Sequence, residues 1–267
     1  MIEFQPATLL AQLAAGGLAF TWVTTRRNET GPGYGWLMRS IFGVLAGTSA
    51  WLGFVTDPVP VRDWTAAATA VVAGMALAVS ILCRQEQDLD VVNWPKLNVA
   101  RLDISKLDIL ASALGLVAVI AGGFAAGHPA ALAVTRSVVG ALFLGAVTSA
   151  MLLGHWYLVQ PGLPRAALLE LVRWTGLLWV PELLVMLWPT GMISVLNGSI
   201  DDGYNGLLGW FWVACVSTTV VLVVLARAAL KERFYAAVMA ATGLLYLGIV
   251  TGFGMDLVAR VLLDTTY

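Results

Sequence analysis

Eight long apolar stretches limit the fold of this chain more than any other feature. They cover approximately residues 6–24, 36–55, 64–83, 107–126, 131–159, 166–190, 206–229 and 234–262. A helix needs about 20 mainly apolar residues to cross the bilayer hydrocarbon, where no water can bond the backbone. We therefore expect an all-α, multi-pass membrane protein, residues 1–267 forming one integral helical domain. Eight crossings would place both termini on the same side.

The basic residues predict the orientation of this bundle. Of the 15 Lys and Arg, 12 fall in or beside one alternate set of loops, and only Arg62, Arg136 and Arg260 fall on the other side. Basic loops stay cytoplasmic. We therefore expect an N-out, C-out topology in a cell membrane, specifically a prokaryotic inner membrane.

The composition excludes several classes of function. The chain is 59% hydrophobic and 12% charged, with a net charge of −1, so no basic surface favours nucleic acid. Cys83 and Cys215 lie in different apolar stretches without the spacing of a metal site. Nucleotide-binding, serine-hydrolase and metalloprotease motifs are also missing from the sequence. We therefore expect a subunit that interacts with quinone or is non-catalytic rather than a stand-alone enzyme. We also expect no metal site.

A tight Pro/Gly turn at 161–164 separates two apolar stretches, and polar residues lie on both sides of it. His155 precedes the turn by about as many residues as Glu170 follows it, so a helical hairpin would bring both to a similar depth. Arg173 lies three residues after Glu170, which is the spacing of one helix face. These residues, with Trp156 and Tyr157, form the predicted cofactor site near the cytoplasmic interface. The alternative is a structural interfacial ion pair and an anchoring histidine.

Charged residues within the apolar stretches are functional candidates because they are costly there. Glu182 follows Pro181 and lies about 18 Å deeper than Glu170 by helical rise, near the predicted midplane, which suits a proton relay. Its alternative role is a neutral acid that bonds across helices. Arg136 is expected to extend towards the headgroups or act in the interior. Asp256 and Arg260, four residues apart, predict a structural ion pair.

The two histidines limit the cofactors that this chain can hold. His128 and His155 are separated by 27 residues, or about 40 Å along a helix, and lie at opposite ends of the same apolar stretch. They cannot both ligate one haem. We therefore expect no intrinsic bis-histidine haem, and quinone is the cofactor that the polar cluster suits best.

These features lead to three functional hypotheses. The first is an integral subunit of a multi-subunit electron-transfer complex, with a quinone or proton-handling site that uses His155 and Glu182. Partner subunits would dock at the 84–106 loop. The helix number and lack of haem ligands are similar to quinone-reactive membrane anchors of molybdopterin oxidoreductase complexes, without a shared motif. The second hypothesis is a proton-coupled small-solute transporter that uses Pro181-Glu182, and the third is a non-catalytic membrane scaffold.

Overall fold

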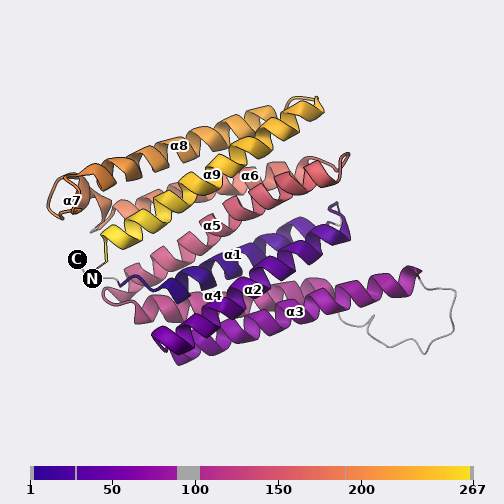
Figure 1. The fold of residues 1–267 in the computed structure, drawn as a ribbon, viewed down its shortest axis with the longest axis horizontal. Coiled ribbons are helices and arrows are strands. Elements are labelled where there is room, and N and C mark those ends of the chain that lie inside the picture. The colour runs from indigo at the N-terminus through magenta and orange to yellow at the C-terminus, as the bar shows by residue number, and fades with distance from the viewer. Residues whose placement is uncertain (1–2, 28, 89–102, 190, 265–267) are drawn as a thin grey trace.

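The computed structural model describes residues 3–27, 29–88, 103–189 and 191–264, and these ranges contain nine helices (Figure 1). The helices are α1 (Pro6–Thr25), α2 (Pro32–Thr56), α3 (Pro60–Asp88), α4 (Ile104–Ala125), α5 (Ala130–Val159), α6 (Ala166–Leu187), α7 (Met192–Leu196), α8 (Leu207–Ala229) and α9 (Tyr235–Leu262). The all-α prediction is confirmed. Most predicted boundaries lie within four residues of the observed ones.

Seven helices in the described ranges are long and apolar enough to cross a membrane: α1, α2, α3 up to Cys83, α4, α5, α8 and α9. The chain is therefore a multi-pass membrane protein. The eighth predicted stretch forms α6, which has 22 residues like α4 but carries Glu170, Arg173 and Glu182. These charges set α6 apart in composition, although it packs within the bundle beside α5 and α8.

Prolines and a side-chain cap define several helix starts. Pro6, Pro32 and Pro60 each begin a helix, where the missing proline N–H is not needed for a helical hydrogen bond. Asp103 precedes α4 and accepts a hydrogen bond from the Ser105 backbone N–H at 3.0 Å. These local signals place the helix ends independently of any tertiary contact.

Asp202 organises the chain that leads into α8. Its carboxylate accepts hydrogen bonds from the backbone N–H groups of Tyr204, Gly206, Leu208 and Gly209, at 2.8 to 3.3 Å. Desolvation would raise the pKa of this carboxyl, but the four hydrogen bonds to its charged form outweigh it and lower the pKa. Asp202 therefore supplies the acceptors that the start of α8 lacks.

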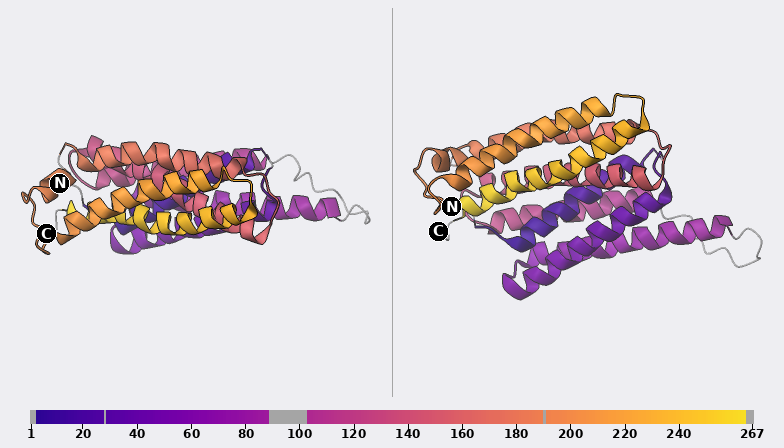
Figure 2. Two further views of the ribbon diagram at one scale, coloured as in Figure 1. Left: turned by 90° about the horizontal axis from the view of Figure 1, so that it is seen from above. Right: turned by 45° about the horizontal axis from the view of Figure 1, so that its top comes forward.

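The long helices form two four-helix rings (Figure 2). In the first ring, α1, α2, α3 and α4 each pack against the next, and α4 returns to α1. In the second, α5, α6, α8 and α9 repeat this arrangement, and the short α7 packs on the end of α8. The rings join mainly through α1 and α5, so the first helix of each half forms the seam.

Two glycines permit the close approach at this seam. A Cβ added to Gly16 would overlap the carbonyl of Ala141, and one added to Gly145 would overlap the Gly16 backbone. Small residues allow helix backbones to meet in this way in membrane proteins. The α1–α5 seam is therefore closer than the α2–α3 packing, where a Cβ added to Gly43 or Gly47 would lie 3.4 or 3.7 Å from an alanine Cβ of α3.

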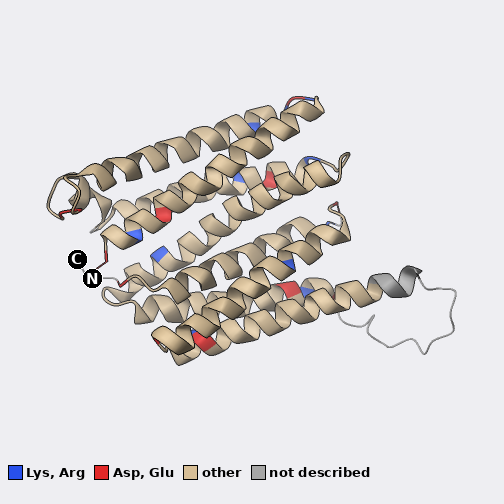
Figure 3. Ribbon diagram, viewed as in Figure 1, with Lys and Arg blue, Asp and Glu red and all other residues tan. Residues whose placement is uncertain are grey.

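Both termini lie at one end of the bundle (Figure 1). We call this the termini end. The opposite end, called the basic end, carries the half-buried Arg165 and the exposed Arg26, Arg27, Lys231 and Arg233 beside its loops (Figure 3). The side chains of the three arginines towards the termini end, Arg62, Arg136 and Arg260, are buried or nearly so. The uneven distribution of charge is therefore sharper on the surface than in the sequence.

Candidate functional site

Glu170 lies at the basic end, but its partners differ from the predicted one. Its carboxylate pairs with Arg26 at 2.6 Å and with Arg27 at 3.4 Å, both from the end of α1. The expected pairing with Arg173 is wrong: Arg173 is exposed and has no ion pair among the described residues. The helix spacing is right, but the chain after α1 offers two closer cations. Glu170 therefore ties the two rings together.

His155 faces outward from α5 and meets a tyrosine of α9. Its Nδ1 lies 2.9 Å from the Tyr246 hydroxyl, and the two rings make an edge-to-face contact at 6.1 Å. Both side chains are exposed on the flank of the bundle. The pair can therefore hydrogen-bond a group that approaches the outer surface of the bundle.

The residues after His155 point in other directions because successive side chains on a helix are about 100° apart. The Tyr157 side chain is buried, and its hydroxyl donates to the Pro164 carbonyl at 2.6 Å. The Trp156 Nε1–H donates to Gln160 Oε1 at 3.2 Å. Tyr157 therefore closes the α5–α6 turn. Of the three consecutive residues 155–157, only His155 is exposed.

Glu182 is fully buried in α6. The helix runs without interruption through Pro181 and ends at Leu187, five residues after Glu182, or about 7 Å along the axis. Glu182 therefore lies in the half of α6 nearer the termini. Its predicted depth in the membrane stays a prediction.

The cations and carboxylate around Glu182 come from α5 and α9. Its carboxyl group interacts electrostatically with the Asp256 carboxyl group and with the guanidinium groups of Arg260 and Arg136. Asp256 and Arg260 form the predicted ion pair, with Arg260 Nη2 2.8 Å from Asp256 Oδ1. Gly140 on α5 leaves room for this pair, since an added Cβ would collide with both side chains. The sequence gives no indication that these helices meet at Glu182.

Arg136 points across the bundle rather than towards the headgroups. Its side chain is buried, and Nε donates to the Val185 carbonyl of α6 at 2.8 Å. The first of its two predicted positions is therefore wrong. The backbone of Arg136 also accepts a hydrogen bond from Arg260 at 2.9 Å. We call Arg136, Glu182, Asp256 and Arg260 the second-ring charge cluster.

Two further buried ion pairs belong to the first ring. Arg39 of α2 binds Asp108 of α4 through two hydrogen bonds of 2.8 and 2.6 Å. Arg62 and Asp63 pair at 2.8 Å, and Arg62 also donates to Gln5 at 2.9 Å. Sequence reasoning missed both because it placed these residues near loops. The only available signal was their position at the edges of apolar stretches.

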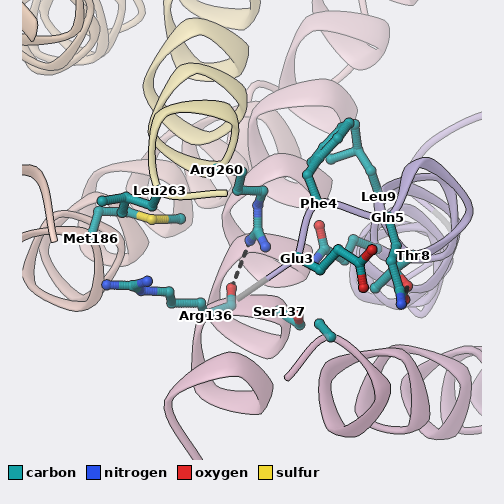
Figure 4. Close-up of a pocket in the computed structure, with 12 residues that line it drawn as sticks. Glu3, Phe4, Gln5, Thr8, Leu9, Arg136, Ser137, Met186, Arg260 and Leu263 are labelled. Carbon is teal, nitrogen blue, oxygen red and sulfur yellow. Dashed lines mark hydrogen bonds between the residues drawn. The ribbon is translucent and has the colours of Figure 1, made fainter. Parts of the chain in front are cut away.

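A small cavity of about 30 Å³ opens between the N-terminal segment, α1, α5 and α9 (Figure 4). In Figure 4 Arg260 reaches down to the Arg136 carbonyl at its centre. Its polar lining consists of Glu3, Gln5, Thr8, Gln12, Arg136, Ser137 and Arg260. At this size the cavity holds about two water molecules and no organic cofactor.

Other predicted features have a defined position or lie outside the description. His128 immediately precedes α5 and His155 lies near its other end, which confirms their separation. Within the described residues, no group of three potential His, Cys, Asp or Glu ligands is close enough to hold a metal. Most of the predicted docking loop, residues 89–102, lies outside the described ranges.

Comparison with models of protein families, with curated proteins and with solved structures gives no match for this chain.

Proposed function

We propose that this chain is the integral membrane subunit of a multi-subunit electron-transfer complex and handles quinone at the basic end of α5 and α9. The observation that carries this proposal is the hydrogen-bonded pair of His155 and Tyr246 on the exposed flank of the bundle. A quinone travels in the bilayer, so its ring must meet hydrogen-bonding groups at a lipid-facing surface. His155 and Tyr246 are such groups.

The chemistry requires two electrons and two protons for each quinone reduced to quinol. The electrons would come from redox centres in partner subunits. An imidazole ring nitrogen can accept and donate a proton, so His155 is suited to pass protons to the quinone oxygens while Tyr246 holds the imidazole ring in place. Glu170 would act indirectly by holding α6 to Arg26 and Arg27. Trp156, Tyr157 and Arg173 would shape or flank the site.

The distribution of charge supports an arrangement in which partner subunits bind at the basic end. We place this end in the cytoplasm, because the arginines towards the termini end are buried while Arg26, Arg27 and Arg233 beside the basic-end loops are exposed. The loops at the basic end outside 89–102 are short and would offer partners a broad surface together with the 84–106 segment. The membrane would then be the inner membrane of a prokaryote.

A proton-coupled transporter is the second candidate, and the second-ring charge cluster favours it. Glu182 is buried beside two arginines and a second carboxyl group, which is an arrangement suited to binding and releasing a proton. Two features favour the first candidate instead. The helix continues through Pro181, and the nearby cavity has room only for water.

The test compares three substitutions in the native membrane with activity normalised to assembled protein. His155→Ala should abolish quinone-dependent turnover and lower the quinone content of the purified complex, and Tyr246→Phe should reduce both. His128→Ala is the matched control at the other end of α5 and should leave both unchanged. Co-purification of Fe–S, flavin or cytochrome subunits is also expected.

Three outcomes would reject this function. Full activity with unchanged quinone content in both His155→Ala and Tyr246→Phe would leave a non-catalytic scaffold. Proton-dependent uptake by the purified chain alone, lost in Glu182→Gln, would establish the transporter. A preparation free of redox subunits after mild detergent extraction would also contradict the assignment to an electron-transfer complex.

A further inference from the structure

Gln12 is the feature of the cavity that calls for a ligand. It lies on α1, lines the cavity and has no exposed surface. Neither its Oε1 nor its Nε2 has a hydrogen-bond partner among the described residues. A buried amide in this position requires both a donor and an acceptor. Water supplies both, and the cavity has room for about two molecules.

The cavity lies about one helical turn closer to the termini end than the buried carboxyl groups of the second-ring charge cluster. Met186 lines the cavity, and Glu182 is four residues earlier on α6, one helical turn deeper on the same face. Arg260 also lines the cavity, and Asp256 is one turn deeper on α9. Two different helices therefore each carry a carboxyl group one helical turn from a residue that lines the cavity.

Arg260 connects the cavity with the buried carboxyl groups. Its Nε and Nη2 bind the Asp256 carboxylate, and Nη2 also donates to the Arg136 carbonyl. The same guanidinium lines the cavity, so its side chain extends from the carboxyl groups to the space beside Gln12. Glu3, in the exposed N-terminal segment, lines the other side of the cavity.

The charged groups that surround the two carboxyls come from three helices. Arg136 lies on α5, Glu182 on α6, and Asp256 and Arg260 on α9. Two guanidinium groups therefore face two carboxyl groups in a site closed to lipid. Adding one proton to the carboxyl pair leaves a single excess positive charge, which water in the cavity can solvate.

We propose that the cavity at Gln12 is a water-filled proton entry that connects the termini end with the buried Glu182 and Asp256 carboxyls. A proton from bulk water passes along the cavity water and is accepted by a carboxylate of the pair. The reverse path releases it, and no bond other than O–H forms or breaks. This inference deepens the proton site of the second candidate and is independent of quinone chemistry at His155.

Infrared spectroscopy of the full chain in lipid tests this route. The protonated carboxyl band of the pair is identified as the band lost in Glu182→Gln or in Asp256→Asn. The buffer is then changed from H₂O to D₂O, and the rate at which this band shifts is measured. We expect a prompt shift in the native chain and a slowing of about tenfold or more in Gln12→Leu, which raises the barrier to proton entry.

The control variant is Thr148→Val. Thr148 is a buried α5 residue whose hydroxyl also has no partner among the described residues, but it does not line the cavity. Its exchange rate should match that of the native chain. If Gln12→Leu does not assemble, Ser137→Val narrows the same cavity from α5 and should also slow exchange.

Either of two results would overturn the inference. One is exchange at the native rate in an assembled Gln12→Leu or Ser137→Val protein. The other is a spectrum in which neither Glu182→Gln nor Asp256→Asn removes a protonated carboxyl band at any pH tested. Because the readout needs no quinone or partner, its failure is separate from a failure of the His155 proposal.

Discussion

Removing the charge of Asp108 should destabilise the first ring strongly. Arg39 and Asp108 are 4% and 1% exposed, and their two hydrogen bonds join α2 to α4, which are diagonal rather than adjacent in the ring. Asp108→Asn leaves the Arg39 guanidinium buried without its counter-charge. Breaking a buried pair in this way costs about 3–5 kcal/mol. The folded-to-unfolded ratio should therefore fall by roughly two to four orders of magnitude.

The double variant Arg39→Met, Asp108→Leu removes both charges and the cost of burying them. Replacing a buried pair with apolar residues of similar volume is often neutral or stabilising, so this variant should recover most of the lost stability. Gly35 leaves room for the Arg39 guanidinium, since a Cβ added to Gly35 would lie 2.7 Å from Arg39 Nη1. Methionine is shorter than arginine and therefore fits the space that Arg39 occupies.

Thermal unfolding of the purified protein in detergent measures the Tm of the native chain, the Asp108→Asn variant and the double variant. Asp108→Asn should lower Tm by about 10 °C, using 2–4 °C for each kcal/mol in a chain of this size. Lys106→Met is the matched control, because Lys106 pairs with Asp103 at 3.8 Å while 82% exposed and should change Tm little. A drop in the double variant as large as in Asp108→Asn would refute the argument from an unpaired buried charge.

Four further outcomes are expected. A cysteine engineered in the 84–106 segment of a cysteine-free background should react with an impermeant maleimide only after cells are permeabilised; labelling of intact cells would refute the orientation. The pure chain should give no stoichiometric pyridine haemochrome, and a haem signal lost in either His128→Ala or His155→Ala would overturn this. Gly145→Leu should cost about 1–3 kcal/mol or more through overpacking at the seam, seen as reduced assembly. Asp202→Asn should lower Tm at neutral pH, because the ionised Asp202 carboxylate has a lowered pKa in the fold and stabilises the folded state at every pH above the carboxyl pKa of the unfolded chain. This stabilisation is lost when acid protonates the carboxylate, so the Tm difference from the native chain should shrink below about pH 4. A difference that grows on acidification would contradict this.

The sequence predicts the helices of this chain well because their signals are local. Apolar length marks each long helix, and prolines at residues 6, 32 and 60 mark three of the starts. It also predicts that both termini share one end. It does not predict which helices become neighbours, because eight similar apolar helices can pack in many orders. The glycines of the α1–α5 seam become informative only when that order is known.

The site shows the same division between local and long-range information. The Asp256–Arg260 pair is predictable because it lies within one helix at a four-residue spacing. The partners of Glu170 and Glu182 are not, since their cations lie on other helices, more than 40 residues away in the chain for each. His155 is correctly marked as unusual, but Tyr246, its hydrogen-bond partner, lies 91 residues further along.

The two candidate sites lie towards opposite ends of the bundle, and this separation lets one set of variants distinguish them. His155 is near the basic end of α5, whereas Glu182 is near the other end of α6. A quinone that takes protons directly through His155 predicts loss of turnover in His155→Ala and normal turnover in Glu182→Gln. A route that carries protons inward through the Gln12 cavity predicts that Glu182→Gln and Gln12→Leu fall together. If turnover falls in all three, the second-ring charge cluster delivers protons to the quinone across the bundle, and the two sites form one path.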